Sequence, residues 1–185
     1  MSEIILGIDP GTNILGYGAV KSNGNKLEMI DAGILYWKSS VDPYEKLKVI
    51  HESVIKLIHQ NKPIALAIEA PFFGKNVQSM LKLGRAQGVA IAAAVHCNLP
   101  IFEYSPKKIK QAITGNGNSS KQQVSAMVCR MLNLDEAPAY FDETDALATA
   151  ICHVLQGGNM ITPKTKKAKN NWASFLAENP ERKIK

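Results

Sequence analysis

The chain has 185 residues, 45% of them hydrophobic, which suits a single domain that folds without disulfide bonds. It has no basic start leading into a long apolar segment, no apolar run long enough to span a membrane, and three cysteines far apart, outside any metal-binding spacing. We therefore expect a cytoplasmic protein without membrane contact. The net charge of +6 comes mostly from residues 161–185, which carry seven basic and two acidic side chains, so a polyanion site elsewhere must be local.

Strands are predicted for most of the first 40 residues. Residues 4–9 are a largely apolar run, Pro10-Gly11 is typical of a turn, and residues 16–20 return as a second strand. A second turn signal at residues 23–25 precedes a third strand over residues 27–37. This order predicts consecutive hairpins.

Helices and strands alternate in the rest of the chain. Apolar residues at spacings of three and four predict an amphipathic helix over residues 44–60. The later predicted elements are strands over residues 64–68 and 101–104 and helices over residues 77–96, 121–132 and 142–155. Hairpins followed by βαβ crossovers predict an α/β fold, with a mixed five-stranded sheet flanked by helices on both faces. We assign residues 1–158 to this domain and residues 159–185 to a basic, flexible tail.

Four acidic residues stand at positions where they could share one site. Asp9 and Glu69 each end a predicted strand just before a proline, and parallel neighbours would bring both to the ligand-binding edge of the sheet. Each alone is also typical of an ordinary turn or strand end. Asp142 and Asp145 open the last helix, where an N-cap and the helix dipole would account for them. Their i, i+3 spacing also places both on one face.

Five segments, in unbroken order, resemble the RuvC family of bacterial Holliday-junction resolvases. They are DPGT, AIEAPFFGKN, LKLGRAQGVAIAAAV, FEYSPKKIKQAITGNGNSSKQQV and DETDALATAICH, and the resemblance covers about residues 3–156. It implies an RNase H-like fold and a metal-dependent, structure-selective endonuclease. Such an enzyme resolves four-way DNA junctions by paired symmetric nicks in recombination and repair, leaving 5′-phosphate and 3′-hydroxyl ends.

The resemblance assigns both catalysis and metal binding to four acids: Asp9, Glu69, Asp142 and Asp145. Crowded carboxylates raise one another's pKa, and divalent cations with oxygen ligands offset their charge. We therefore expect Mg²⁺, with Mn²⁺ able to substitute, and two ions per site. In the two-metal scheme one ion activates a water and the other stabilises the leaving oxygen.

Four further residues are candidates for DNA contact. Phe72 lies just past Glu69, and the resemblance gives it the role of stacking on a base at the branch point, although a core position is the ordinary alternative. The resemblance places Lys110 and Lys121 near the active site, where they could neutralise phosphates, and Lys75 is a weaker candidate. Each lysine is also compatible with an ordinary solvated surface position.

The helix over residues 77–96 is expected to mediate a homodimer. Gly84, Gly88 and Ala92 form a smooth stripe at four-residue spacing, and the resemblance favours a two-fold dimer there, with one site for each cut strand. The family commonly reads GQARG where this chain has GRAQG, so no DNA contact is assigned to Arg85 by analogy. The RuvA–RuvB branch-migration complex is a partner by resemblance alone.

Two other classes of function remain open. DPGT also resembles the first phosphate loop of actin-like and sugar-kinase ATPases, but the chain is short for their two-lobed body and a second Gly-rich phosphate loop is not evident. A non-catalytic DNA-binding module, with the acids as helix caps, is the other alternative. Such a module should not concentrate four acids where DNA lies.

Overall fold

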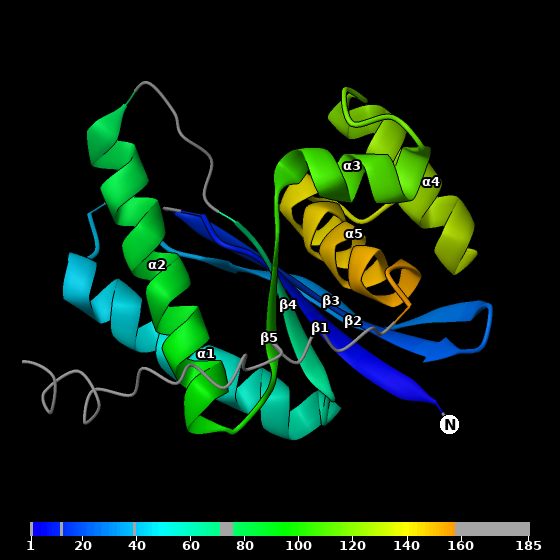
Figure 1. Ribbon diagram of the computed structural model, residues 1–185. Helices are drawn as coiled ribbons and strands as arrows, with labels where there is room; N and C mark the ends of the chain where they lie inside the picture. The colour runs from blue at the N-terminus through cyan, green and yellow to red at the C-terminus, as the bar shows by residue number, and fades with distance from the viewer. Residues whose placement is uncertain (1, 12, 39, 71–75, 158–185) are drawn as a thin grey trace, which may run out of the picture.

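The computed structural model describes residues 2–11, 13–38, 40–70 and 76–157 (Figure 1). Its elements are β1 (Glu3–Asp9), β2 (Ile14–Asn23), β3 (Lys26–Tyr36), α1 (Pro43–Asn61), β4 (Ala65–Glu69), α2 (Val77–His96), β5 (Ile101–Tyr104), α3 (Pro106–Thr114), α4 (Lys121–Leu132) and α5 (Phe141–Leu155). The strands form one sheet in the order β3-β2-β1-β4-β5. β1, β2 and β3 pair antiparallel, whereas β4 runs parallel to both β1 and β5. The predicted mixed five-stranded sheet is confirmed.

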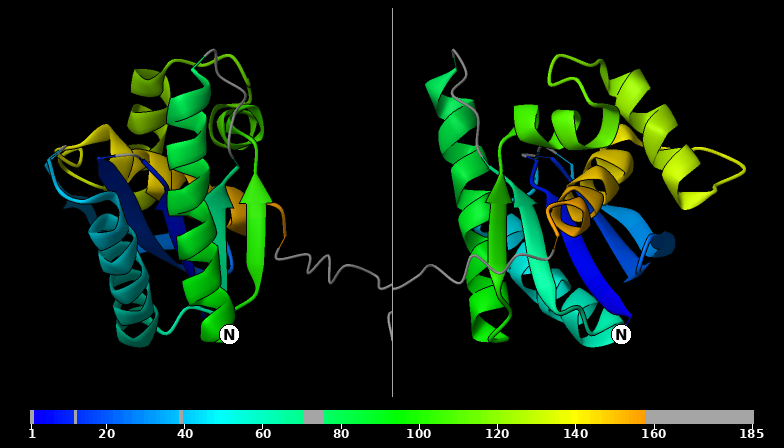
Figure 2. Two further views of the ribbon diagram at one scale, coloured as in Figure 1. Left: turned by 90° about the vertical axis from the view of Figure 1, so that its left-hand side faces the viewer. Right: turned by 45° about the vertical axis from the view of Figure 1, so that its right-hand side comes forward.

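Helices cover both faces of the sheet, as predicted. Figures 1 and 2 show α1 and α2 side by side on one face and α3, α4 and α5 on the other. Along β1 the side chains alternate: Leu6 and Ile8 are buried on the α1–α2 side, and Ile5 packs with Leu147 of α5. Because successive strand residues point to opposite faces, Asp9 belongs to the same face as Ile5, the face that α5 covers.

Glycines in β1 and β2 let α5 lie directly on the sheet. A Cβ at Gly7 would stand 2.0 Å from the backbone oxygen of Ala146, and one at Gly16 would stand 2.0 Å from that of Asp142. Gly16 is also the antiparallel partner of Asp9. The absence of these two side chains therefore brings the first turn of α5 down beside the end of β1.

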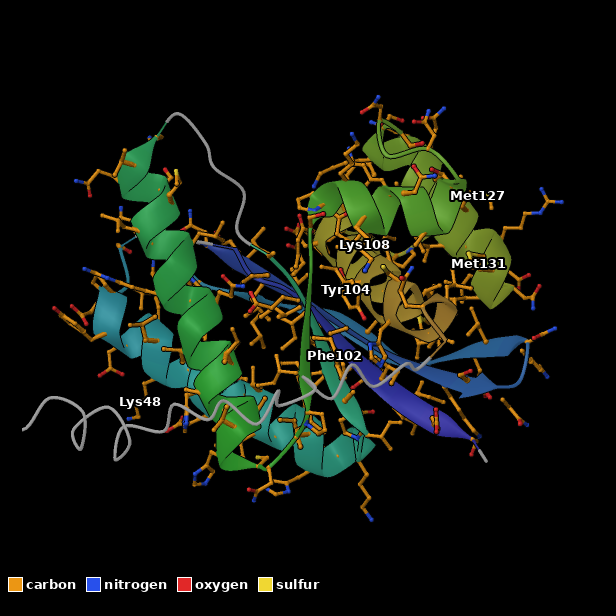
Figure 3. The ribbon with its side chains drawn as sticks, in the orientation of Figure 1. Lys48, Phe102, Tyr104, Lys108, Met127 and Met131 are labelled. Atoms are coloured by element: carbon orange, nitrogen blue, oxygen red, sulfur yellow. The ribbon has the colours of Figure 1, made fainter. Side chains whose placement is uncertain are left out.

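The edge strand β5 anchors the other end of α5. The rings of Phe102 and Tyr104, labelled in Figure 3, both pack against the buried ring of His153 on α5. The Tyr104 hydroxyl and His153 Nδ1 are 2.8 Å apart in a hydrogen bond. Burial lowers the pKa of His153, which favours the neutral ring in this bond. The helix is thus fixed at both ends.

Two features differ from the expectations. Helix α3 was not predicted; its N-cap residue Ser105 accepts a hydrogen bond from Lys108 N, and its Ile109 and Ile113 are buried. α5 begins at Phe141 with Tyr140 as its N-cap residue, so Asp142 lies in the first turn and the N-cap interpretation was wrong.

The domain boundary at residue 158 stays a prediction, since the proposed tail over residues 159–185 lies outside the described residues. Among the helices that the structure describes, none combines the length and the apolar character needed to cross a membrane.

Candidate active site

Two of the predicted acids end adjacent parallel strands. Ile8 of β1 pairs with Ile68 of β4, so Asp9 and Glu69 follow in neighbouring positions at the carboxyl ends of the strands. Glu69 shares the strand face of Ala65 and Ala67, which pack toward α5. Both carboxylates therefore leave the same edge and the same face of the sheet.

A pocket of about 210 Å³ opens at this edge. Its polar lining consists of Asp9, Glu69, Asp145, Lys110 and Lys121, and its apolar wall is formed by residues of α3 and α4. These polar residues come from five elements, β1, β4, α5, α3 and α4. The fold thus brings together three of the four predicted acids and two of the predicted basic residues.

Asp142 takes a different position from the other three acids. It lies one turn before Asp145 on α5 and above Gly16, and it does not contribute to the lining of the pocket. Its charge nevertheless acts on Asp9, whose pKa it helps to raise. It therefore stands at the margin of the acidic cluster.

Burial and mutual repulsion make the cluster unfavourable for negative charge. Burial, followed by the charges of Glu69 and Asp145, raises the pKa of Asp9 to about 8. Burial and the charge of Asp145 also raise the pKa of Glu69 to about 7. Lys121 opposes both shifts but does not cancel them. At neutral pH these shifts favour the protonated form of Asp9 and leave Glu69 partly protonated unless a further positive charge enters the pocket.

Lys121 supplies the positive charge already present. Its Nζ lies 2.6 Å from Oδ2 of Asp145, an ion pair that joins α4 to α5. Burial lowers the pKa of Lys121, but the hydrogen bond and the charge of Asp145 outweigh burial and raise it overall. Lys110 adds a second positive charge, which lowers the pKa of Glu69 and so opposes the effect of burial and of Asp145.

The donor set fits a hard divalent cation. All four acids offer carboxylate oxygens, the ligands that Mg²⁺ and Mn²⁺ prefer, and the raised pKa values show that the pocket lacks compensating charge. Within the described parts of the chain, no three Asp, Glu, His or Cys side chains are already arranged to hold one ion. Binding would therefore require the carboxylates to draw together, with Lys121 giving up part of its contact with Asp145.

One residue near the site was not among the predicted functional candidates. Gln87 of α2 is buried, and its Nε2 donates to the backbone oxygen of Glu69 (3.4 Å) and to Oε2 of Glu103 (3.0 Å). It thereby ties α2 to the strand end that carries Glu69. A glutamine within a largely apolar helical segment is the signal that the sequence offers for this contact. Phe72 and Lys75, predicted to contact DNA, lie outside the described residues.

The chain is similar to known proteins over nearly its whole length. The family described as "Crossover junction endodeoxyribonuclease RuvC" matches residues 5–153. Proteins of that description from Bacteroides fragilis and Cytophaga hutchinsonii are 54% and 51% identical to it; the matches cover 97% and 98% of this chain and 95% and 88% of theirs.

Solved structures give the same relationship. The structure described as "T. thermophilus RuvC in complex with Holliday junction substrate" has a TM-score of 0.80 and 32% identity, covering 84% of this chain and 94% of that one. The yeast mitochondrial Holliday junction resolvase Ydc2, at 15% identity and a TM-score of 0.59, shares the fold.

Proposed function

This chain belongs to the RuvC family of crossover junction endodeoxyribonucleases, and we propose that the acidic pocket at the ends of β1 and β4 is where it cuts DNA. The enzyme is a metal-dependent nuclease that resolves four-way Holliday junctions in recombination and repair. The observation that carries the assignment of the site is the convergence of Asp9, Glu69 and Asp145 around one pocket in which two acids have raised pKa values.

The acids act as ligands and as orienting groups. We propose that Asp9, Glu69, Asp142 and Asp145 hold Mg²⁺, two ions per site, with Mn²⁺ able to substitute. A divalent cation bound there supplies Lewis acidity, which lowers the pKa of an attacking water and stabilises the departing 3′ oxygen. The parallel register of β1 and β4 fixes the backbone positions of Asp9 and Glu69, so only their side chains would have to turn to reach a shared cation.

Lys110 and Lys121 complete the site on the phosphate side. Both line the pocket from the helical layer, opposite the strand ends. With a cation held by the carboxylates, the Lys121 ammonium, now bonded to Asp145, would be available to a phosphate oxygen of the scissile group. We propose the same role in substrate binding for Lys110, and stacking on a base near the branch point for Phe72, with Lys75 beside it.

The exposed face of α2 supports a homodimer. Val77, Leu81 and Val95 are 64%, 56% and 61% exposed, and a Cβ at Gly84 or Gly88 would meet no atom within 4 Å. An apolar surface that allows such close approach suits a second copy of the chain. Two sites related by a two-fold axis would cut two strands of a near-symmetric junction. We further propose action in the cytoplasm together with the RuvA–RuvB complex.

The alternatives are less compatible with these observations. In a non-catalytic DNA-binding module the acids would serve as caps, yet Asp142 is not the N-cap of α5, and Asp145 forms an ion pair in the pocket. Family membership over residues 5–153 likewise leaves no support for an ATPase or transferase.

Cleavage of a synthetic four-way junction with Mg²⁺ tests the site. We expect Asp9→Asn and Glu69→Gln to lower single-turnover cleavage by at least about 10²-fold, because each removes a charged ligand, while junction binding is retained. Glu136→Gln, an exposed residue outside the pocket, is the matched control and should cut normally. Cleavage at the wild-type rate by Asp9→Asn would reject the proposed site, and ATP hydrolysis by the same preparation would favour the kinase-like alternative.

A further inference from the structure

A second, larger pocket lies on the other face of the sheet. The catalytic pocket is covered by α3, α4 and α5, whereas this pocket is lined by α1 and α2. It has a volume of about 610 Å³ and lies between the start of α1 and the first turns of α2, which pack side by side in Figures 1 and 2. Among its lining residues are Asn13, Tyr44, Lys46, Lys82 and Arg85. We name it the α1–α2 groove. We propose that it binds the phosphate backbone of junction DNA beyond the catalytic pocket; this rests on the proposed nuclease function.

The charge of the groove suits a polyanion. Three cationic side chains, Lys46, Lys82 and Arg85, line it against a single carboxylate, that of Asp42. Asp42 is engaged as the N-cap of α1, where its Oδ1 accepts from Tyr44 N at 2.8 Å and from a second backbone amide. In the part of the chain that the structure describes, neither Lys82 nor Arg85 forms an ion pair. Their positive charge is available to a ligand.

The other polar groups are those that commonly contact DNA backbones. Tyr44 is 75% exposed, and Lys46 Nζ donates to Oδ1 of Asn13 at 3.4 Å, which holds both side chains at the rim. Lysine, arginine, asparagine and tyrosine are typical donors to phosphate oxygens. Lys82 and Arg85 are three residues apart on α2, so they lie on one helix face and can contact neighbouring phosphates.

The groove adjoins the catalytic pocket closely enough for one DNA molecule to contact both. Asp9 lines the catalytic pocket and Gly11 lines the groove, and two residues of extended chain span at most about 7 Å. One turn of duplex is about 34 Å long, so DNA held at the acids would extend past this distance. Lys110 and Lys121 lie on the other flank. Basic surfaces on both sides of an acidic pocket would offset its repulsion of DNA.

A second copy of the chain is the competing occupant. Gly84 and Gly88 mark the face proposed for the dimer, whereas Lys82 and Arg85 line the flank of α2 that turns toward α1. An interface there would have to desolvate three cations that face one already engaged carboxylate. DNA phosphates satisfy those charges without that cost.

The test is the salt dependence of junction binding, measured without divalent metal so that no cleavage occurs. Lys82→Ala with Arg85→Ala is compared with Lys48→Ala with Lys56→Ala, which removes the same charge from exposed α1 positions outside the groove; Lys48 is labelled in Figure 3. Losing two phosphate contacts should lower the slope of log affinity against log salt by about 1.8 per protomer. The affinity lost between 50 and 200 mM salt would then shrink about 12-fold.

The control pair should keep the wild-type slope, and Lys82→Arg with Arg85→Lys should keep it too, since the charge is retained. An unchanged slope in the alanine pair, or an equal change in the control pair, would overturn the proposal. So would a shifted dimer dissociation concentration with an unchanged slope, which would assign the groove to a second copy. Junction cleavage by the wild-type protein with Mg²⁺, measured in the same preparation, separates the two proposals. If the wild-type protein did not cut but the alanine pair still changed the salt slope, the proposed nuclease site would be rejected and the groove would stand.

Discussion

Replacing Asp9 by asparagine should stabilise the metal-free protein. The folded protein raises the pKa of Asp9 from 3.8 to about 8, chiefly through burial and the charge of Glu69. Between these values the unfolded chain releases a proton that the folded chain retains. The Asp9 carboxyl therefore does not destabilise the fold below about pH 4. As pH rises from 4 to 8 it lowers the free energy of unfolding progressively, and above about pH 8 the loss no longer grows. Asparagine has nearly the same shape and does not titrate.

The size of the effect follows from the pKa difference. At pH 7 the group is 3.2 units above its unfolded pKa, which corresponds to a ceiling of about 4 kcal/mol against folding at about 1.4 kcal/mol per unit. The pocket is open to water, which screens part of this penalty. We expect about 2 kcal/mol, or a rise of roughly 6 °C in Tm for a domain of this size.

Thermal unfolding in EDTA between pH 4 and pH 8.5 measures this difference. The Tm advantage of Asp9→Asn over wild type should be absent near pH 4 and should grow toward pH 8. Mg²⁺ should then narrow it by stabilising wild type selectively, because only wild type keeps the full ligand set. Asp135→Asn, an exposed acid on the loop before α5, is the matched control and should show no pH-dependent gain.

Two results would refute the reasoning. A variant no more stable than wild type at pH 8 without metal would mean that the Asp9 carboxylate is not strained in the pocket. Equal stabilisation of wild type and variant by Mg²⁺ would place the bound cation somewhere other than the acidic cluster.

Three further substitutions test the framework of the site. Gly16→Ala places a Cβ 2.0 Å from the backbone oxygen of Asp142, so we expect a loss of about 1–3 kcal/mol in urea unfolding together with reduced cleavage. Lys121→Met removes the cation bonded to Asp145 and should slow single-turnover cleavage about 10²-fold, with Lys121→Arg recovering part of the rate. Leu147→Ala empties a fully buried position between α5 and the sheet and should cost about 3 kcal/mol, read from the denaturant midpoint.

The sheet and its strand-end acids were predictable because their signals are local. Short apolar runs that end in Asp9 and Glu69 indicate strands, and two hairpin reversals followed by a helical crossover make those two strands parallel. Parallel neighbours share one carboxyl edge, so the sequence alone places these two acids together. The same logic gave five strands and helices on both faces.

The other parts of the site depend on contacts between distant segments. Whether Asp145 faces the pocket depends on how closely α5 lies against the sheet, and that is set by the missing side chain of Gly16. The pairing of Asp145 with Lys121 joins residues 24 positions apart, on two different helices. The spacing of apolar residues along the sequence predicts neither the close approach of α5 nor this ion pair. α3 was missed because its nine residues bury only two side chains, too few for a helical pattern to stand out.

The orientation of Arg85 illustrates the same limit. Its position in the sequence fixes its place on α2, but its surroundings depend on where α1 packs. A motif comparison therefore left its role open, whereas the packing of α1 beside α2 brings Lys46 to the groove that Arg85 and Lys82 line.

The chain order of the elements bears on when a nascent chain becomes a nuclease. α5 is the last described helix to leave the ribosome, yet it packs against β1 and β2, which are made first. Until α5 has emerged, the sheet face on which it packs lacks its main cover, and the strand-end acids lack Asp145. We therefore expect a chain that terminates before α5 not to cut DNA, because it lacks both Asp145 and the helix that packs on β1 and β2.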